Sequence, residues 1–339
     1  MKAVSIETYG AAESLSIGDF AMPNPGPDDV LVRVRAAGVN RLDILLREGR
    51  VFQVPLPRIP GTDFSGDIVA VGSNVTGNRI GERIFAAPIL SCGECQHCRR
   101  GDDNLCANFG TIGSTIDGGY AEYVRIPARN AVPLPEQLDF VTGASFGLTY
   151  ATAASMLRRG RLAAGEWVLV LGANGGLGYA AIELAHLIGA RVIAVNRDAS
   201  RDGALRDCGA DVVIRPDAQM PGTVLALTGG RGVQLAFEHV ASATFAHSLA
   251  SLATDGRLVL GGVTTGIEAT LDLKAVFTKR LEILGARGSG RKDLDQVVRL
   301  AAEGQVRPLV QQVLPLEQAA QAHHWLESGR VLGKIVLTV

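Results

Sequence analysis

The sequence predicts an α/β protein of two domains, and two observations along the chain support this expectation. Up to about residue 145, short apolar runs alternate with Gly and Pro, which is typical of a small antiparallel β-domain. Beyond that point, strand-like runs alternate with helical stretches, which indicates a parallel sheet with helical crossovers. A chain of 339 residues is long enough for two domains, and 47% hydrophobic with 20% charged residues predicts a sizeable core.

The first domain is expected to consist of closely spaced strands. Residues Met1–Ile6 are predicted to form the first strand, and a Pro- and Gly-rich loop precedes the alternating run Val30–Val34. Further strands are expected at Ile68–Val71 and Arg83–Ala86, each bounded by glycine. This spacing favours a barrel-like antiparallel arrangement.

The second domain is expected to hold a doubly wound parallel sheet. Its predicted strands are Trp167–Leu171, Arg191–Val195, Val212–Ile214, Val233–Phe237, Arg257–Leu260 and Leu281–Leu284. The clearest helix between them is Leu177–Ile188, because apolar residues recur there on successive turns. After about Lys292 the chain is predicted to form a helix, a strand around Val310–Val313, another helix and a final strand Lys334–Val339.

Charge and hydropathy exclude several classes of function. The formal net charge is -1, and no basic cluster interleaves with aromatic residues, so neither nucleic acid nor an acidic membrane is an expected partner. The N-terminal segment lacks the apolar run of a signal peptide, and no apolar stretch is long enough to span a bilayer. We therefore expect a soluble cytoplasmic protein whose thiols stay reduced.

A glycine-rich turn follows the first predicted strand of the parallel sheet. It reads Gly172-Ala173-Asn174-Gly175-Gly176-Leu177-Gly178 and opens the helix that follows. Glycines let the backbone approach a pyrophosphate, and the N–H groups of a helix N-terminus bind phosphate. The flanking strand and helix favour a dinucleotide site over a turn without ligand. We predict cofactor contacts from Gly172, Asn174, Gly175, Gly176, Leu177 and Gly178.

The end of the second strand of this sheet indicates which nucleotide binds. NAD sites usually carry an acidic residue there, about 20 residues past the glycines, to bind the ribose hydroxyls. This chain has Asn196 and Arg197, with Arg201 close behind. Because a guanidinium can bind a 2′-phosphate that a carboxylate would repel, we predict NADP(H). Asp198 is the competing ribose ligand if the strand ends later.

Four of the five cysteines lie in one loop with the spacing C-x2-C-x2-C-x7-C. They are Cys92, Cys95, Cys98 and Cys106. Four thiolates in a reduced compartment suit a tetrahedral zinc ion, and a filled ligand set makes such a site structural. Paired disulfides and an iron–sulfur cluster are the alternatives. Cys208 stands alone, and no role is expected for it.

Several segments of the whole chain together resemble the zinc-type alcohol dehydrogenase and quinone oxidoreductase superfamily of medium-chain dehydrogenases/reductases. Besides the glycine turn and the cysteine loop, the matching segments are Gly38–Asp43, Pro60–Gly66, Gly118–Tyr123 and Gly333–Leu337. The resemblance implies a GroES-like β-barrel substrate domain, at residues 1–145 and 287–339, and a Rossmann cofactor domain at 146–286. It also implies homodimers or homotetramers built through the cofactor domains.

The chain departs from the family's pattern where catalytic zinc binds. By this resemblance, the Cys, His and Cys that hold the zinc in the alcohol dehydrogenases correspond to Asn40, Thr62 and Ser145, and the carboxylate after the His corresponds to Asp63. None of the first three is a strong zinc ligand. The Asn40-x2-Asp43 pair is similar to the pattern found in the quinone oxidoreductases and enoyl reductases that work without catalytic zinc.

Reduction of a C=C bond conjugated to a carbonyl agrees with a site that has no catalytic metal. The enolate oxygen that forms needs hydrogen-bond donors in a dry site, whereas oxidation of an alcohol usually needs a metal. We predict that Asn40 and Thr62 donate and that Asp43 positions Asn40 or holds the loop. Asp63 completes the predicted catalytic set, and local backbone capping is the alternative for Asp43 and Asp63.

Further cofactor contacts are predicted outside the glycine turn. Thr149 matches the family's cofactor-contacting threonine, with helix capping as its alternative role, and Lys334 lies in the matching C-terminal segment. His239 and Val240 follow the fourth strand of the parallel sheet, and Gly262 and Val263 follow the fifth, at the edge where ligands bind. A surface histidine is the alternative for His239.

The predicted function is reduction of enones, quinones or related alkenes by NADPH. A metal-free NADP-dependent alcohol or aldehyde dehydrogenase with Asp63 or Asp43 as base is the first alternative. A cofactor-binding protein without turnover is the second, because a fold does not guarantee an activity. Pocket walls are expected near Ile44, Leu45, Phe52 and Phe109, and the substrate itself, with or without a CoA group, is not readable.

Overall fold

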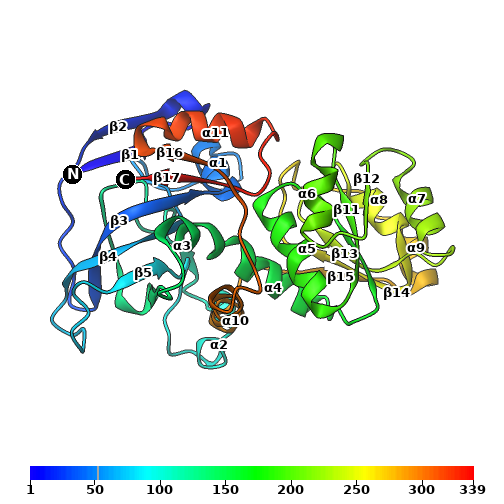
Figure 1. Ribbon diagram of the computed structural model, residues 1–339, viewed down its shortest axis with the longest axis horizontal. Coiled ribbons are helices and arrows are strands. Elements are labelled where there is room, and N and C mark those ends of the chain that lie inside the picture. The colour runs from blue at the N-terminus through cyan, green and yellow to red at the C-terminus, as the bar shows by residue number, and fades with distance from the viewer. Residues whose placement is uncertain (52) are drawn as a thin grey trace. The chain divides into compact units, whose positions relative to one another are not determined.

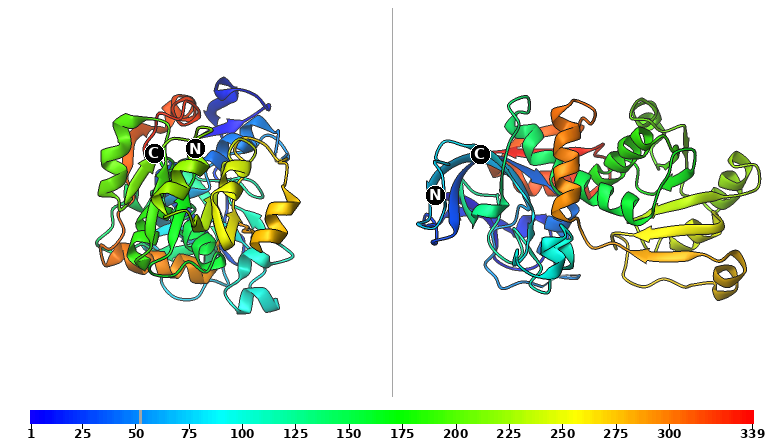
Figure 2. Two further views of the ribbon diagram at one scale, coloured as in Figure 1. Left: turned by 90° about the vertical axis from the view of Figure 1, so that its right-hand side faces the viewer. Right: turned by 90° about the horizontal axis from the view of Figure 1, so that it is seen from below.

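The computed structural model describes residues 1–51 and 53–339, so Phe52, one of the expected pocket residues, lies outside the described residues. The chain forms two compact units, Met1–Ala151 with Ser289–Val339 and Thr152–Gly288. We call them the first and second units, and their elements can be followed in Figures 1 and 2. The sequence predicts domain boundaries after residues 145 and 286.

The first unit is a mainly antiparallel β-structure with short helices. Its elements are β1 (Lys2–Ile6), β2 (Leu15–Asp19), β3 (Asp29–Val39), α1 (Arg41–Glu48), β4 (Asp63–Val71), β5 (Arg83–Ala86), β6 (Ile89–Leu90), α2 (Gln96–Arg99), β7 (Gly110–Thr111), β8 (Tyr123–Pro127), β9 (Ala131–Pro133), α3 (Phe140–Phe146), α10 (Arg291–Ala302), β16 (Val310–Pro315), α11 (Ala319–Glu327) and β17 (Lys334–Thr338). Helix α4 (Thr149–Arg159) crosses from the first unit into the second.

The strand order in the first unit brings the two ends of the chain together. A seven-stranded sheet runs β16-β17-β3-β4-β5-β9, and β8 also pairs with β3. The long strand β3 buries alternating apolar side chains in one core with residues of β4, β8 and β17. Strands β16 and β17 are parallel because α11 carries the chain back between them, whereas the other pairs of this sheet are antiparallel. The pairing of β17 with β3 places residues near 334 beside residues near 40.

The second unit is the doubly wound parallel sheet that the sequence predicts. Its elements are β10 (Trp167–Val170), α5 (Gly176–Ile188), β11 (Arg191–Val195), α6 (Asp202–Asp207), β12 (Val212–Ile214), α7 (Met220–Leu227), β13 (Val233–Glu238), α8 (Phe245–Ala250), β14 (Leu252–Leu260), α9 (Leu273–Lys279) and β15 (Glu282–Gly285). The strand order is β12-β11-β10-β13-β14-β15, with every pair parallel. Strand order reverses beside β10, so the ends of β10 and β13 border the crevice where ligands bind in such sheets.

Buried aliphatic residues on the central strands explain why this sheet is covered on both faces. Val168, Leu169, Val192 and Ile193 are fully buried, as continuous apolar runs in parallel strands require.

Among the described residues, no helix is long and apolar enough to cross a membrane.

Candidate functional site

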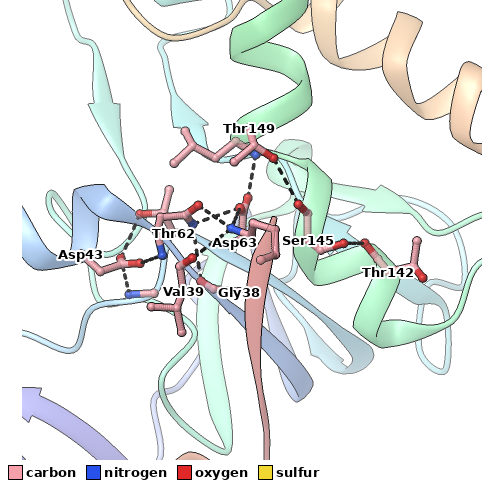
Figure 3. A network of polar contacts seen from close by, with 12 residues as sticks. Gly38, Val39, Asp43, Thr62, Asp63, Thr142, Ser145 and Thr149 are labelled. Atoms are coloured by element: carbon pink, nitrogen blue, oxygen red, sulfur yellow. Dashed lines mark hydrogen bonds and ion pairs between the residues drawn. The ribbon is translucent and has the colours of Figure 1, made fainter. Parts of the chain in front are cut away.

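A buried carboxylate at the start of α1 organises the first polar cluster of the first unit (Figure 3). Asn40 lies between β3 and α1 as the N-cap of the helix, and its backbone N–H donates to Asp43 Oδ2 at 2.8 Å. This is half of a capping box, which an Asn-x-x-Asp sequence allows. Asp43 Oδ1 accepts the backbone N–H of Gly61 at 3.1 Å. Asp43 therefore ties the end of β3 to the loop before β4.

A buried lysine and a second carboxylate fix the side chain of Asn40. Lys334 Nζ donates to Asn40 Oδ1 at 2.5 Å and to the Val39 carbonyl at 3.1 Å. Asn40 Nδ2 donates to Asp63 Oδ2 at 3.0 Å, and the backbone N–H of Leu148 donates to Asp63 Oδ1 at 2.7 Å. Because an ammonium has only donors and an ionised carboxylate only acceptors, these partners determine which way the amide faces.

Two of the predicted catalytic donors have weak protein partners. The second contact of Asn40 Nδ2 is with the Gly38 carbonyl at 3.4 Å, and Thr62 Oγ1 lies 3.4 Å from Asp43 Oδ1. Both distances exceed the usual range for hydrogen bonds. Asn40 is 4% exposed and Thr62 is fully buried, so both donors lie where water is scarce.

The cluster places two acids and one base together out of water. Burial raises the pKa of Asp43 to about 6, although hydrogen bonds from Asn40 and Gly61 oppose this effect. Burial also raises the pKa of Asp63, against the attraction of Lys334. The pKa of Lys334 is lowered, because burial outweighs the attraction of the two carboxylates. Its ammonium lies 3.5 Å from Asp63 Oδ2.

The helices next to the cluster carry two further residues that the sequence analysis named, one as the counterpart of a zinc ligand and one as a cofactor contact. Ser145 lies in α3, is fully buried, and donates its hydroxyl to the Thr142 carbonyl at 2.7 Å. Thr149 begins α4, and its hydroxyl donates to the Ser145 carbonyl at 3.2 Å. The first unit thus brings together Asn40, Asp43, Thr62, Asp63 and Lys334. Ser145 and Thr149 lie beside Asp63 and Thr62 (Figure 3). Lys334, which the sequence predicts to contact the cofactor, donates hydrogen bonds from its ammonium to Asn40 and Val39 in this cluster.

A row of buried polar side chains, which the sequence reasoning missed, extends from this cluster. Arg47 is 1% exposed, and its guanidinium donates to His323 Nδ1 at 3.2 Å and also binds Glu327. His323 Nε2 must then carry the proton and donate to the Tyr120 hydroxyl, 3.2 Å away. Burial lowers the pKa of His323 to about 3 and raises that of Tyr120, which the charge of Asp43 raises further. No local pattern could reveal this row, because residues 47 and 323 are far apart in sequence.

The four clustered cysteines have the geometry of a tetrahedral metal site. Their sulfur atoms all lie within 4.8 Å of one another, and the separations include 3.8 Å for Cys92–Cys98 and 3.5 Å for Cys92–Cys106. A zinc ion with bonds of about 2.3 Å to four sulfurs requires edges of about 3.8 Å. Backbone N–H groups of Cys95 and Asn108 donate to these sulfurs, which favours thiolates. Among the described residues, this is the one convergent group of three or more His, Cys, Asp or Glu side chains.

The glycine turn of the second unit leaves room for a ligand close to the backbone at the start of α5. Gly172 has a φ of 60°, and a Cβ on Gly178 would lie 2.3 Å from the Gly172 carbonyl oxygen, so the fold itself requires both glycines. Gly175 differs, because a Cβ there would meet nothing nearer than 3.6 Å at an ordinary φ. Gly175 caps α5 without a side chain. Packing therefore does not explain this glycine.

The residues predicted to select the nucleotide follow the carboxyl end of β11. They are Asn196, Arg197 and Arg201. Asn196 is 2% exposed and its Nδ2 donates to the Asp198 carbonyl at 2.7 Å. The Asp198 carboxylate accepts from Ser200 and from Arg201 Nε at 3.1 Å, which makes it a local cap. The Arg197 side chain is exposed.

One basic residue at this edge escaped the sequence reasoning. Arg215 follows β12, and its guanidinium donates to the Asn196 carbonyl at 2.8 Å and to both carboxylate oxygens of Asp202. The sequence shows a basic residue directly after the predicted strand Val212–Ile214, and the structure pairs this strand with β11.

The residues expected after the fourth and fifth strands also meet the glycine turn. A Cβ on Gly172 would lie 3.1 Å from His239 Nε2, so the imidazole borders the turn. That nitrogen is buried and has no hydrogen-bond partner among the described residues, and burial lowers the pKa of His239. Gly262 lies against the backbone of His239, while Val240 and Val263 are partly exposed beside them.

Comparisons with known families agree with this architecture. Residues 26–136 match the alcohol dehydrogenase GroES-like domain, and residues 176–303 match the zinc-binding dehydrogenase domain. The two matches cover most of the chain. The first lies in the first unit, and the second lies mostly in the second unit. The chain belongs to the medium-chain dehydrogenase/reductase superfamily, and it is an oxidoreductase of that superfamily.

Individual relatives carry names of more than one kind. An NAD-dependent alcohol dehydrogenase of Sulfolobus acidocaldarius is 32% identical over all of both chains. A quinone oxidoreductase of Rattus norvegicus is 29% identical over 99% of this chain and 97% of its own. A crystal structure of an NAD-dependent alcohol dehydrogenase superposes with a TM-score of 0.95 at 38% identity over all of both chains.

Proposed function

We propose that this protein reduces activated C=C bonds, such as those of enones, quinones or enoyl compounds, with NADPH and without a catalytic metal. One observation carries the proposal. The positions that correspond to the family's catalytic zinc ligands are an amide, Asn40, and the hydroxyls of Thr62 and Ser145, gathered in a buried cluster. Such neutral donors suit a developing oxyanion better than they suit zinc.

The chemistry follows from the weakly held donors. NADPH, when bound, would supply a hydride to the β-carbon of the alkene; negative charge would develop on the carbonyl oxygen, and a proton from solvent at the α-carbon would complete the reduction. The Asn40 Nδ2–H and the Thr62 hydroxyl can each exchange a protein contact of 3.4 Å for a hydrogen bond to the negatively charged substrate oxygen, which is a stronger acceptor. Asp43 holds the Asn40 backbone, and Asp63 holds the Asn40 side-chain amide, through hydrogen bonds of 2.8 Å and 3.0 Å. Because the donors are fixed and dry before the reaction, little reorganisation opposes it.

NADP(H) fits the residues of the second unit. Gly175, Gly176, Leu177 and Gly178 would face its pyrophosphate at the start of α5, and Arg197 would bind the 2′-phosphate. Asp198 is the residue that could instead bind the ribose of NAD. Its carboxylate accepts hydrogen bonds from Ser200 and Arg201 as a local cap, which supports the assignment of NADP(H). Thr149, His239, Val240, Gly262 and Val263 remain further proposed contacts.

Arg197→Ala tests the choice of nucleotide. We expect the Kd for NADPH to rise roughly 10- to 100-fold, as loss of a charge-assisted contact implies, with little change for NADH. Arg206→Ala, an exposed guanidinium on α6, is the matched control. Tighter binding of NADH than NADPH by the unaltered protein would overturn the assignment.

A structural zinc ion fits the four-thiol group. Cys92, Cys95, Cys98 and Cys106 would complete its coordination and leave no position for substrate. The ion would hold the loop between β6 and β7, and it would take no part in hydride transfer.

Oligomers through the second unit are also part of the proposal. Strand β15 is an edge of the parallel sheet and exposes Ile283 at 39%, while the preceding helix α9 exposes Leu273 at 70% and Phe277 at 71%. An exposed apolar edge of this kind favours pairing with a second copy. Phe277→Asp should shift the sedimentation coefficient toward monomer, whereas Ile80→Asp, 57% exposed in the first unit, should not.

A turnover assay distinguishes the proposed reaction from its alternatives. We expect NADPH oxidation with cyclohexenone or benzoquinone and no NADP⁺ reduction with primary alcohols. Thr62→Val should lower kcat by roughly 10- to 100-fold, whereas Thr278→Val on exposed α9 should leave it unchanged. Turnover of alcohols alone would support the alcohol dehydrogenase activity that several relatives' names favour. Tight NADPH binding without turnover would support a binding role.

A further inference from the structure

We propose that Lys334 is the electrostatic centre of the candidate site: its ammonium orients the Asn40 amide and offsets the negative charge that develops on the substrate oxygen. This inference rests on the proposed function and assigns the residue a role beyond contact with a cofactor. It makes Lys334 a positioning residue that acts through Asn40.

Sheet register places the ammonium where this role requires it. Lys334 is the first residue of β17, and Ile335 pairs with Val39 of the antiparallel neighbour β3. Lys334 therefore lies across the sheet from Asn40, although the two are 294 positions apart. Lys334 is 4% exposed, and its Nζ has partners at 2.5 Å and 3.1 Å, Asn40 Oδ1 and the Val39 carbonyl.

The ammonium gives the Asn40 amide one orientation. A flipped amide would place its NH2 group against the Lys334 ammonium and its oxygen against the Asp63 carboxylate, and both contacts would be repulsive. A neutral side chain at position 334 would remove the first of these penalties. The ammonium also polarises the amide through Oδ1, which makes the N–H a stronger donor.

Charge balance gives the ammonium a second effect. Two buried carboxylates, Asp43 and Asp63, belong to the cluster. In the described part of the chain, Lys334 is the cation that contacts them, through its ion pair with Asp63. An oxyanion formed beside Asn40 would be a third negative charge in a dry site. Without the ammonium, repulsion from the carboxylates would oppose its formation.

Four variants separate this role from structural and cofactor-binding roles. Lys334→Met removes the charge and keeps much of the volume, and Lys334→Arg keeps the charge. Asp63→Asn combined with Lys334→Met removes both charges and avoids leaving a buried carboxylate unpaired. Lys274→Met, an exposed lysine of α9, is the control.

The main readout needs no turnover. A series of nitrophenols is bound to the protein saturated with NADP⁺, and the fraction bound as phenolate is measured by absorbance. We expect the unaltered protein to favour phenolate, Lys334→Met and the double variant to lose this preference, and Lys334→Arg to restore part of it. The kcat for enone reduction should fall about 100-fold in Lys334→Met, whereas the Kd for NADPH should change less than about threefold.

Three results would overturn the inference. One is an unchanged phenolate fraction in Lys334→Met. Another is a rise in the Kd for NADPH that accounts for the whole loss of kcat/KM, since that would mark a cofactor contact. The third is full recovery of kcat in the double variant, since Lys334 would then only neutralise Asp63 and would not act through the Asn40 amide. If the unaltered protein reduces no alkene, the proposed function fails, and the phenolate measurement still tests Lys334.

Discussion

Replacement of Asp43 by an asparagine should change how the stability of the first unit depends on pH. The pKa of this fully buried carboxyl is raised from 3.8 to about 6, chiefly by burial. The folded protein therefore holds the proton more tightly than the unfolded chain does. Its contribution to the free energy of unfolding is fully present below pH 3.8 and is lost as pH rises through 6.

The size of the effect follows from the two pKa values. Ionisation of Asp43 in the folded state costs about 3 kcal/mol in total, at 1.36 kcal/mol for each tenfold change in proton affinity. About 1.4 kcal/mol of this is lost between roughly pH 5 and pH 8, because part of the loss occurs at lower pH. The amide of Asp43→Asn does not titrate, so the free energy of unfolding of the wild type should fall by that amount relative to the variant.

Urea unfolding followed by tryptophan fluorescence can isolate the first unit. The chain has two tryptophans, and in a Trp167→Phe background Trp325 on α11 reports on the core of the first unit alone. In that background, the difference in free energy of unfolding between the protein with the native Asp43 and the Asp43→Asn variant is measured across the pH range. A difference that stays constant with pH would refute the assignment of a raised pKa to Asp43.

Three further results are expected. Cys106→Ser should reduce bound zinc from about one ion per chain to almost none and lower the Tm, whereas Cys208→Ser should retain the metal; equal zinc in both would contradict a four-thiolate site. The neutral state of His323, whose pKa of about 3 lies below 6.5, stabilises fully above pH 6.5 and less as pH falls toward 3. By roughly pH 5 the wild type should lose about 2 kcal/mol relative to His323→Phe, and parallel pH curves would disprove this. Gly175→Ala should raise the Kd for NADPH more than about tenfold while lowering the Tm only by the small cost of a poorer helix cap, whereas Gly178→Ala should lower the Tm much more; an equal fall in Tm for both variants would remove the ligand argument.

Local patterns accounted for most of the fold. The strands of the parallel sheet and helix α5 were predicted because apolar periodicity and glycine turns are short-range signals. The pairing of β16 with β17 was not foreseen as parallel, because strand direction depends on the path of α11 between them. The spacing of four cysteines predicted their convergence for the same local reason.

The candidate site was predictable only as a list of residues. The sequence named Asn40, Thr62 and Asp63, yet the contact of Asn40 with Lys334 depends on the register of β17 with β3. The row from Arg47 to Tyr120 through His323 joins segments that no spacing rule connects. Burial decides the protonation of these groups, and burial is a property of the assembled unit.

Metal content and turnover, measured on the same preparation, test whether polar side chains around Asn40 and Thr62 support hydride transfer to an activated alkene without a metal ion. Zinc per chain and the rate of NADPH oxidation with an enone are determined before and after dialysis against a mild chelator. We expect about one zinc ion per chain, bound by the four cysteines, and sustained enone reduction. Two ions per chain, with activity that disappears as the second is removed, would contradict this expectation.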